Sequence, residues 1–236
     1  MFDLSPDILR SLPVWFVATL LSLTLHEAAH ALVGRWGGDD TATDQVTLDP
    51  TPHIRREPVG MILVPIVSFL FNGGGWMIGW ASAPYDPFWA QRHPKKAALM
   101  AAAGPISNFL LAAIGAGLLH LGIAAWGWSP AVAPTLDLLA VGADGEPNVF
   151  ATFASILFSV NLLLGLFNLL PVPPLDGHAV VPIVLNERQT QRWFGLFADR
   201  MAGLIGLVVA WIVFSKLAWP AWALSLKLLY PSLTYG

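Results

Sequence analysis

Four long apolar runs dominate the chain. They extend over residues 12–33, 97–123, 150–185 and 201–229. Each is long enough to cross a membrane, because the hydrocarbon core takes about 20 residues of helix. The pattern therefore predicts membrane-spanning helices, and we expect an all-α polytopic membrane protein with about four to six transmembrane segments.

A fifth apolar run, residues 59–71, is shorter. It has 13 residues and is followed directly by Asn72-Gly73-Gly74-Gly75. This length favours a re-entrant or interfacial element over a full crossing, because a straight helix of that length does not reach across the bilayer core. A short tilted crossing is the alternative, and the sequence leaves both open.

Two segments between the apolar runs predict short extended structure. Residues 41–48 contain β-prone Thr and Val between Gly37-Gly38 and Asp49-Pro50, so they are a candidate strand. Residues 79–84 are a second extended candidate, and an exposed edge there could hold a peptide by strand addition. A pair of ordinary loops is the alternative interpretation.

Composition agrees with a membrane protein. Of 236 residues, 56% are hydrophobic and 11% are charged, and the mean hydropathy is +0.63, which is too apolar for an ordinary soluble domain. The net charge of −3 comes without a basic cluster, so no nucleic-acid partner is expected. We expect one integral membrane domain over residues 1–236, with a core at 12–186 and C-terminal helices at 187–236.

The basic residues predict an orientation in the membrane. If residues 59–71 dip into the bilayer and return, nine Lys and Arg residues lie on one side and three on the other. Basic residues favour the cytoplasmic side. We therefore expect the loops at 34–58, 72–96 and 187–200 in the cytosol and both chain ends outside.

Two histidines and a glutamate lie inside the first apolar run. His26 and His30 are four residues apart, so on a helix they share one face, where both imidazoles can reach one zinc ion. Glu27 lies beside them and is a candidate general base. A buried polar cluster satisfied by neighbouring helices is the alternative. It is disfavoured because three residues that are costly in a bilayer share catalytic spacing.

A catalytic zinc site needs a third protein ligand, and the chain has no cysteine to provide one. Asp176 lies inside the third apolar run, two residues after the segment 171–174, whose three prolines are expected to unwind the helix. An unpaired carboxylate is unfavourable there, and a metal would compensate its charge. We therefore predict one zinc ion per chain, held by His26, His30 and Asp176. A capped, helix-breaking turn is the alternative for Asp176.

These motifs resemble those of the site-2 protease family of intramembrane zinc metalloproteases, peptidase family M50. The helix-borne HExxH motif matches residues 26–30, and the NxxPxPxxDG-type segment matches residues 168–177. A further family-like element is Gly104-Pro105-Ile106-Ser107-Asn108. The resemblance covers roughly residues 12–185, and two distant motifs in the expected order are more specific than HExxH alone.

The resemblance implies regulated intramembrane proteolysis, with cleavage within or near transmembrane segments of other membrane proteins. In the family the aspartate of the second motif is the third zinc ligand, which agrees with Asp176. Glu27 would take a proton from the attacking water and return it to the leaving amine. Asn168 and Asn108 are candidates for binding the substrate or the oxyanion. The structural alternatives are that Asn168 bonds freed carbonyls and that Asn108 packs helices together.

The expected setting is a multi-pass protein of the bacterial cell membrane, surrounded by lipid, with a transmembrane protein as substrate. The chain looks like a minimal form of the family, without a PDZ-sized insertion or a CBS-like tail. One alternative function is a non-catalytic zinc-binding scaffold or pseudoprotease, which would need ligands but no base such as Glu27. Another is a zinc carrier or channel, in which ligands would repeat along several helices.

Overall fold

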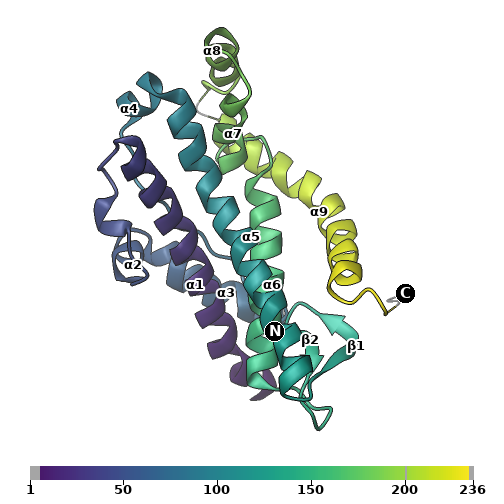
Figure 1. The fold of residues 1–236 in the computed structure, drawn as a ribbon. Coiled ribbons are helices and arrows are strands. Elements are labelled where there is room, and N and C mark those ends of the chain that lie inside the picture. Colours follow the sequence, from purple (N-terminus) through teal and green to yellow (C-terminus); the bar gives the residue numbers. More distant parts are fainter. Residues whose placement is uncertain (1–5, 200, 234–236) are drawn as a thin grey trace. The chain divides into compact units, whose positions relative to one another are not determined.

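The computed structural model describes residues 6–199 and 201–233, and these are mainly helical (Figure 1). The α-helices are α1 (Pro6–Gly37), α2 (Thr51–Arg56), α3 (Val64–Phe71), α4 (Pro87–Arg92), α5 (Pro94–Ala125), α6 (Val149–Asn168), α7 (Asp176–Val180), α8 (Glu187–Leu196) and α9 (Ala202–Leu229). The strands are β1 (Ser129–Thr135) and β2 (Leu138–Val141). Short 3-10 turns lie at Thr43–Gln45 and Val181–Ile183, and a π-helical turn at Val59–Leu63 precedes α3.

Four of the helices within the described residues are long and apolar enough to cross a membrane, namely α1, α5, α6 and α9. They coincide with the four apolar runs, which confirms an all-α polytopic membrane protein. The helix of the third run ends at Asn168, before the prolines, so residues 169–175 form turns outside α6. The Val59–Phe71 segment is helical but shorter than these four. Whether it dips into the bilayer or crosses it stays a prediction.

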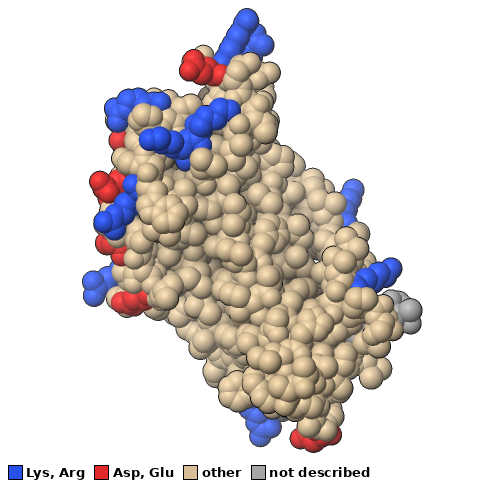
Figure 2. Space-filling model, in the orientation of Figure 1, with Lys and Arg blue, Asp and Glu red and all other residues tan. Residues whose placement is uncertain are grey.

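Apolar side chains cover the outer surface of α9. Leu204, Ile205, Val208 and Ile212 are each more than half exposed. Figure 2 shows that Lys, Arg, Asp and Glu occupy only small areas of the visible surface. Soluble proteins rarely expose apolar surface of this kind, whereas lipid covers it in a membrane.

The chain divides into two compact units. The first comprises Met1–Glu27, Thr47–Ser82 and Asn108–Leu162, and the second comprises Ala28–Val46, Ala83–Ser107 and Leu163–Gly236. Helices α1, α5 and α6 each continue without a break from one unit into the other. The expected single domain over residues 1–236 stays a prediction.

The two-stranded sheet lies in a connection for which the sequence predicted no secondary structure. Strands β1 and β2 are antiparallel, with a register irregularity between Pro130 and Thr135. The hairpin is attached to α6, because the Leu139 amide donates a hydrogen bond to Ser155 Oγ (2.9 Å). Two prolines in β1 obscured the strand in the sequence, and a two-stranded ribbon tolerates them because each strand is an edge.

The predicted strand at residues 41–48 is wrong. This segment forms turns and the 3-10 turn at Thr43–Gln45. Asp39 Oδ1 accepts hydrogen bonds from the Thr41 amide (3.0 Å) and the Thr41 hydroxyl (2.5 Å). Such local side-chain bonds compete with a sheet ladder, which explains why β-prone residues form no strand here.

Residues 79–84 also form no strand. The Trp80 amide donates to the Gly60 carbonyl (3.1 Å), so this segment lies against the π-helical turn. The prediction of a second strand is therefore wrong. Peptide binding by strand addition needs a sheet edge, and residues 79–84 do not form one.

Helices α5 and α6 approach closely at Gly115, within the first unit. A Cβ atom at this position would lie 2.6 Å from the Phe158 backbone nitrogen and 2.9 Å from its Cα. Only a residue without a side chain fits, which is how small residues bring membrane helices together. A Cβ atom on Gly117, two residues further along α5, would meet no atom of the described residues outside its own stretch of helix within 4 Å.

We expect Gly115→Ala to lower the thermal unfolding midpoint of the purified protein in detergent. Forcing a methyl group into a packed contact costs about 1–3 kcal/mol. The matched control is Gly117→Ala, which should leave the midpoint unchanged or raise it slightly, because alanine favours helix. Circular dichroism against temperature measures both. Equal midpoints for the two variants would contradict the close contact.

Candidate metal centre

Helix α1 carries both predicted histidine ligands and the predicted base. His26 and His30 are each 6% exposed, and Glu27 is 5% exposed. Because α1 is one continuous helix, His26 and His30 lie one turn apart on the same face. The helical spacing expected from the sequence is therefore present.

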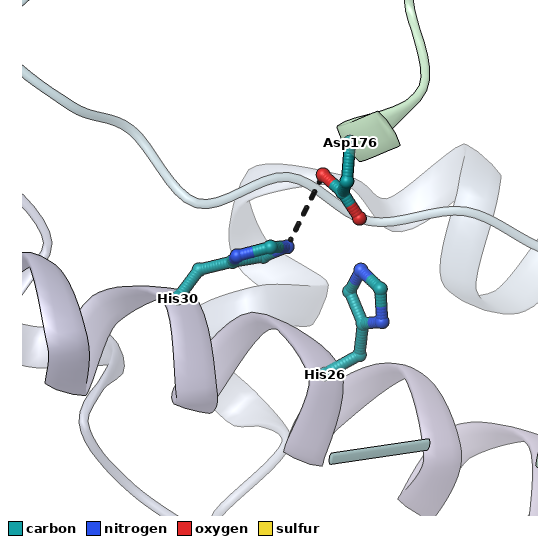
Figure 3. A group of neighbouring side chains, drawn as sticks. All are labelled: His26, His30 and Asp176. Carbon is teal, nitrogen blue, oxygen red and sulfur yellow. Dashed lines mark ion pairs between the residues drawn. The ribbon is translucent and has the colours of Figure 1, made fainter. Parts of the chain in front are cut away.

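Asp176 is the first residue of α7, directly after the turns at residues 169–175. It belongs to the same unit as His30. One carboxylate oxygen, Oδ1, lies 3.3 Å from His30 Nε2, as the dashed line in Figure 3 shows. The distant aspartate found by sequence reasoning is thus beside the second histidine.

His26, His30 and Asp176 together offer a possible metal-binding set. One ligand atom from each residue lies within 4.8 Å of the other two (Figure 3). Two imidazole nitrogens and one carboxylate oxygen are a donor set that suits catalytic zinc, with a fourth position open. Their assignment as ligands stays a prediction.

The contacts of His30 fix which ring nitrogen faces the carboxylate. Its Nδ1 lies 2.8 Å from the Met100 carbonyl oxygen, which can only accept a hydrogen bond. Nδ1 therefore carries the proton of the neutral ring, and the Nε2 lone pair points at Asp176 Oδ1. Two acceptors at 3.3 Å repel each other unless a cation lies between them. Either a proton or a bound metal ion would remove this repulsion.

Asn108, on α5, contacts the other histidine. His26 Nδ1 lies 2.6 Å from Asn108 Oδ1, and Asn108 Nδ2 donates to Asn161 Oδ1 at 2.8 Å. Both ends of the Asn108 amide therefore have protein partners, and the side chain is fully buried. Its predicted role with substrate or oxyanion stays a prediction. The sequence suggested Asn108 as a substrate-binding or helix-packing residue, and its contact with a predicted ligand was missed.

Asn168, the other candidate for substrate binding, is the last residue of α6 and is partly exposed. It lies at the junction between α6 and the turns that lead to Asp176. This position is compatible with its predicted role, which stays a prediction. The same holds for Glu27 as the base.

Tight packing fixes the backbone around Asp176. A Cβ atom on Gly177 would lie 2.4 Å from the carbonyl oxygens of Leu169 and Leu170. A Cβ atom on Gly206, in α9, would lie 1.9 Å from the Pro173 carbonyl oxygen. Glycine at both places lets the unwound segment fold back on itself and lets α9 pack directly against it.

Lys95, near the start of α5, also holds this segment. Its Nζ donates hydrogen bonds to the carbonyls of three residues after α7, namely Pro182 (2.8 Å), Ile183 (2.7 Å) and Leu185 (2.5 Å). Prolines and helix ends leave carbonyls without helical partners, and an ammonium group with three donors satisfies them together. Lys95 is five residues before Met100, whose carbonyl orients His30. The start of α5 thus contacts both the segment after α7, through Lys95, and the ring of His30, through the Met100 carbonyl.

A sequence model of Peptidase family M50 matches residues 14–213. The chain belongs to peptidase family M50. The matched range includes His26, Glu27, His30 and Asp176.

Three relatives of this M50 chain are named as candidate zinc metalloproteases. YwhC of Bacillus subtilis (strain 168) is 36% identical over 190 residues, which cover 78% of this chain and 76% of YwhC. Rip3 of Mycobacterium tuberculosis (strain H37Rv) is 31% identical over 82% of this chain but only 36% of Rip3. Rip2 of Mycolicibacterium smegmatis is 27% identical over 73% of this chain and 57% of Rip2. No solved structure matches.

We expect Lys95→Met to weaken zinc binding by this M50 chain. The change removes the donor shared by three carbonyls and loosens the segment that carries Asp176. A loss of about 1 kcal/mol would weaken the affinity about fivefold. Competition with a chromogenic chelator measures it.

The matched control is Lys96→Met, which also removes one positive charge from α5. Lys96 Nζ donates to the Gly37 carbonyl (3.0 Å) and not to the segment after α7. Zinc affinity should therefore stay at the wild-type value. An equal loss in both variants would indicate an effect of net charge and contradict the role of Lys95.

Proposed function

We propose that this chain is a zinc-dependent intramembrane endopeptidase of the site-2 type. It hydrolyses peptide bonds within or near transmembrane segments of other membrane proteins, in the bacterial cell membrane. His26, His30 and Asp176 hold one zinc ion per chain. The partners are a transmembrane protein substrate and the surrounding lipid, without nucleic acid.

One observation supports this proposal above the others. Two of the predicted ligands lie on α1, a candidate membrane span, and the third begins α7, which the turns at 169–175 join to α6, another candidate span. In this proposal a site built on such helices lies at membrane depth, where ionisable residues are generally functional. Peptides reaching it come from membrane-embedded or membrane-adjacent segments. The names of the relatives support the zinc-dependent proteolysis.

Bound zinc would supply Lewis-acid chemistry, polarising a peptide carbonyl and making water nucleophilic at neutral pH. The chain itself contributes the proton transfers. Glu27, buried beside His26 on α1, accepts a proton from the water and returns it to the leaving amine. A protease needs such a buried carboxylate as a general base in addition to the metal ligands. A zinc-binding scaffold needs only the ligands.

The substrate must unwind before it can be cut. Helix carbonyls are engaged in hydrogen bonds along their own backbone and are shielded by side chains. Helix-breaking residues near the cleaved bond should therefore favour cleavage. Asn168, at the end of α6, is placed in this proposal to bind the extended peptide or the oxyanion.

The test uses purified protein in detergent with a panel of tagged transmembrane substrates, some containing Gly or Pro in the membrane segment. We expect the wild type to cut and to lose activity when zinc is chelated. Glu27→Gln should keep one zinc per chain but cut at least about 100-fold more slowly, because it removes general-base catalysis. Gel analysis gives the rates, and metal analysis gives the zinc content.

Two results would contradict parts of this proposal. Cleavage by Glu27→Gln at the wild-type rate would remove Glu27 from the chemistry. A wild type that binds one zinc per chain but cuts no member of the panel would favour the zinc-binding scaffold. Asp176→Ala is a useful third variant, since it should lose zinc and cleavage together.

A further inference from the structure

We propose that Asn161, on α6, is a positioning residue for the metal centre and acts on His26 through Asn108. The inference rests on the proposed zinc binding by His26, but not on proteolysis or on any particular substrate. Nothing in the sequence motifs marks Asn161, which lies within an apolar run and outside the NxxPxPxxDG-type segment.

A chain of hydrogen bonds joins three helices of the first unit. Asn161 Nδ2 donates to Ser22 Oγ on α1 and to the Leu157 carbonyl on α6, each at 2.8 Å. Asn161 Oδ1 accepts from Asn108 Nδ2 on α5 (2.8 Å), and Asn108 Oδ1 lies 2.6 Å from His26 Nδ1. Ser22 Oγ donates onward to the Ala18 carbonyl (2.7 Å). Ser22, Asn108 and Asn161 are fully buried.

The direction of every bond in this chain follows from one end. The Leu157 carbonyl can only accept, so the amide nitrogen of Asn161 must face it. The Asn161 oxygen then faces Asn108, which must present its own amide nitrogen. That leaves the Asn108 oxygen toward His26, and this oxygen also can only accept. His26 Nδ1 must therefore carry the ring proton.

The ring proton of His26 decides whether it can bind a metal. A neutral imidazole has one protonated nitrogen and one lone pair. With the proton fixed on Nδ1, the lone pair is on Nε2, the nitrogen left for the metal. Without Asn161, Asn108 can turn its amide over and present a donor to His26. Nδ1 would then hold the lone pair, and Nε2 would carry the proton and could not bind zinc.

A purely structural role for Asn161 predicts a different result. Asparagine side chains also join membrane helices through hydrogen bonds between them. Removing such a link would lower stability and leave the zinc affinity of the folded protein unchanged. Groups that orient a metal-bound histidine typically change metal affinity by about 10- to 100-fold.

The experiment compares zinc affinity, by chelator competition, with the thermal midpoint of the metal-free protein in detergent. Asn161→Leu is close to the native side chain in size and removes its polar atoms. We expect its zinc affinity to fall by about 10- to 100-fold. If this variant does not fold, Asn161→Ala, which adds no bulk, takes its place with the same expectation. The matched control is Ser159→Ala on α6, a buried serine that donates only to the Ser155 carbonyl of its own helix.

A double variant separates orientation from packing. A carboxylate has acceptor oxygens only, so Asp at position 108 holds the proton on His26 Nδ1 whichever way it is turned. Asn108→Asp combined with Asn161→Leu should therefore regain zinc affinity to within about threefold of the wild type, a difference below 1 kcal/mol. Its metal-free midpoint should remain low, because the link between the helices is still missing.

The outcomes are distinct. A zinc affinity of Asn161→Leu within twofold of the wild type, or a double variant as weak as the single one, would overturn the role of Asn161 and leave the proposed function intact. A wild type that binds no zinc would overturn the proposed zinc chemistry itself. Loss of affinity in Ser159→Ala equal to that in Asn161→Leu would also overturn the inference, since any buried polar change would then suffice.

Discussion

The predicted metal centre depends on one constraint, which is that polar groups inside apolar helices must find partners within the protein. Water is absent from the bilayer core, and an unpaired buried polar group costs several kcal/mol there. His26, His30, Asn108 and Asn161 are each at most 6% exposed, and each has a hydrogen-bonding partner on another helix. The same bonds that remove this cost also orient the two imidazoles, so stability and ligand geometry have one origin.

The two histidines are oriented in different ways. The partner of His30 is the backbone carbonyl of Met100, and this acceptor is present whatever side chain occupies position 100. The partner of His26 is a side chain, Asn108, whose own orientation is set by Asn161. Substitutions at Asn108 or Asn161 can therefore change the contact of His26 Nδ1, whereas the contact of His30 Nδ1 depends on the position of the α5 backbone. Outer contacts of this kind commonly set ligand basicity and metal affinity.

The sequence predicted the parts of the molecule that depend on local or strongly periodic signals. Four long apolar runs gave the four candidate spans, and His26, His30 and Asp176 were chosen from spacing and from the cost of charge in an apolar run. The strand at 41–48 failed because Thr41 bonds Asp39 locally, and the hairpin was missed because β1 contains two prolines. Asn161 could not be found, since one polar residue among apolar ones carries no spacing signal and its partners are 53 and 139 residues away.

The unwound segment before Asp176 follows from the same constraint. Histidines one turn apart on α1 can supply two ligands from regular helix, but the third must reach them from a different part of the chain. A carboxylate at a helix start, after a run of turns, can do so, and the turns then leave carbonyls that helix would have satisfied. Glycines at 177 and 206 let the backbone of these turns pack where any side chain would collide. After α7, Lys95 bonds three further carbonyls, those of residues 182, 183 and 185. This irregular backbone is thus in contact with protein, which is the condition under which membrane proteins tolerate irregular backbone at membrane depth.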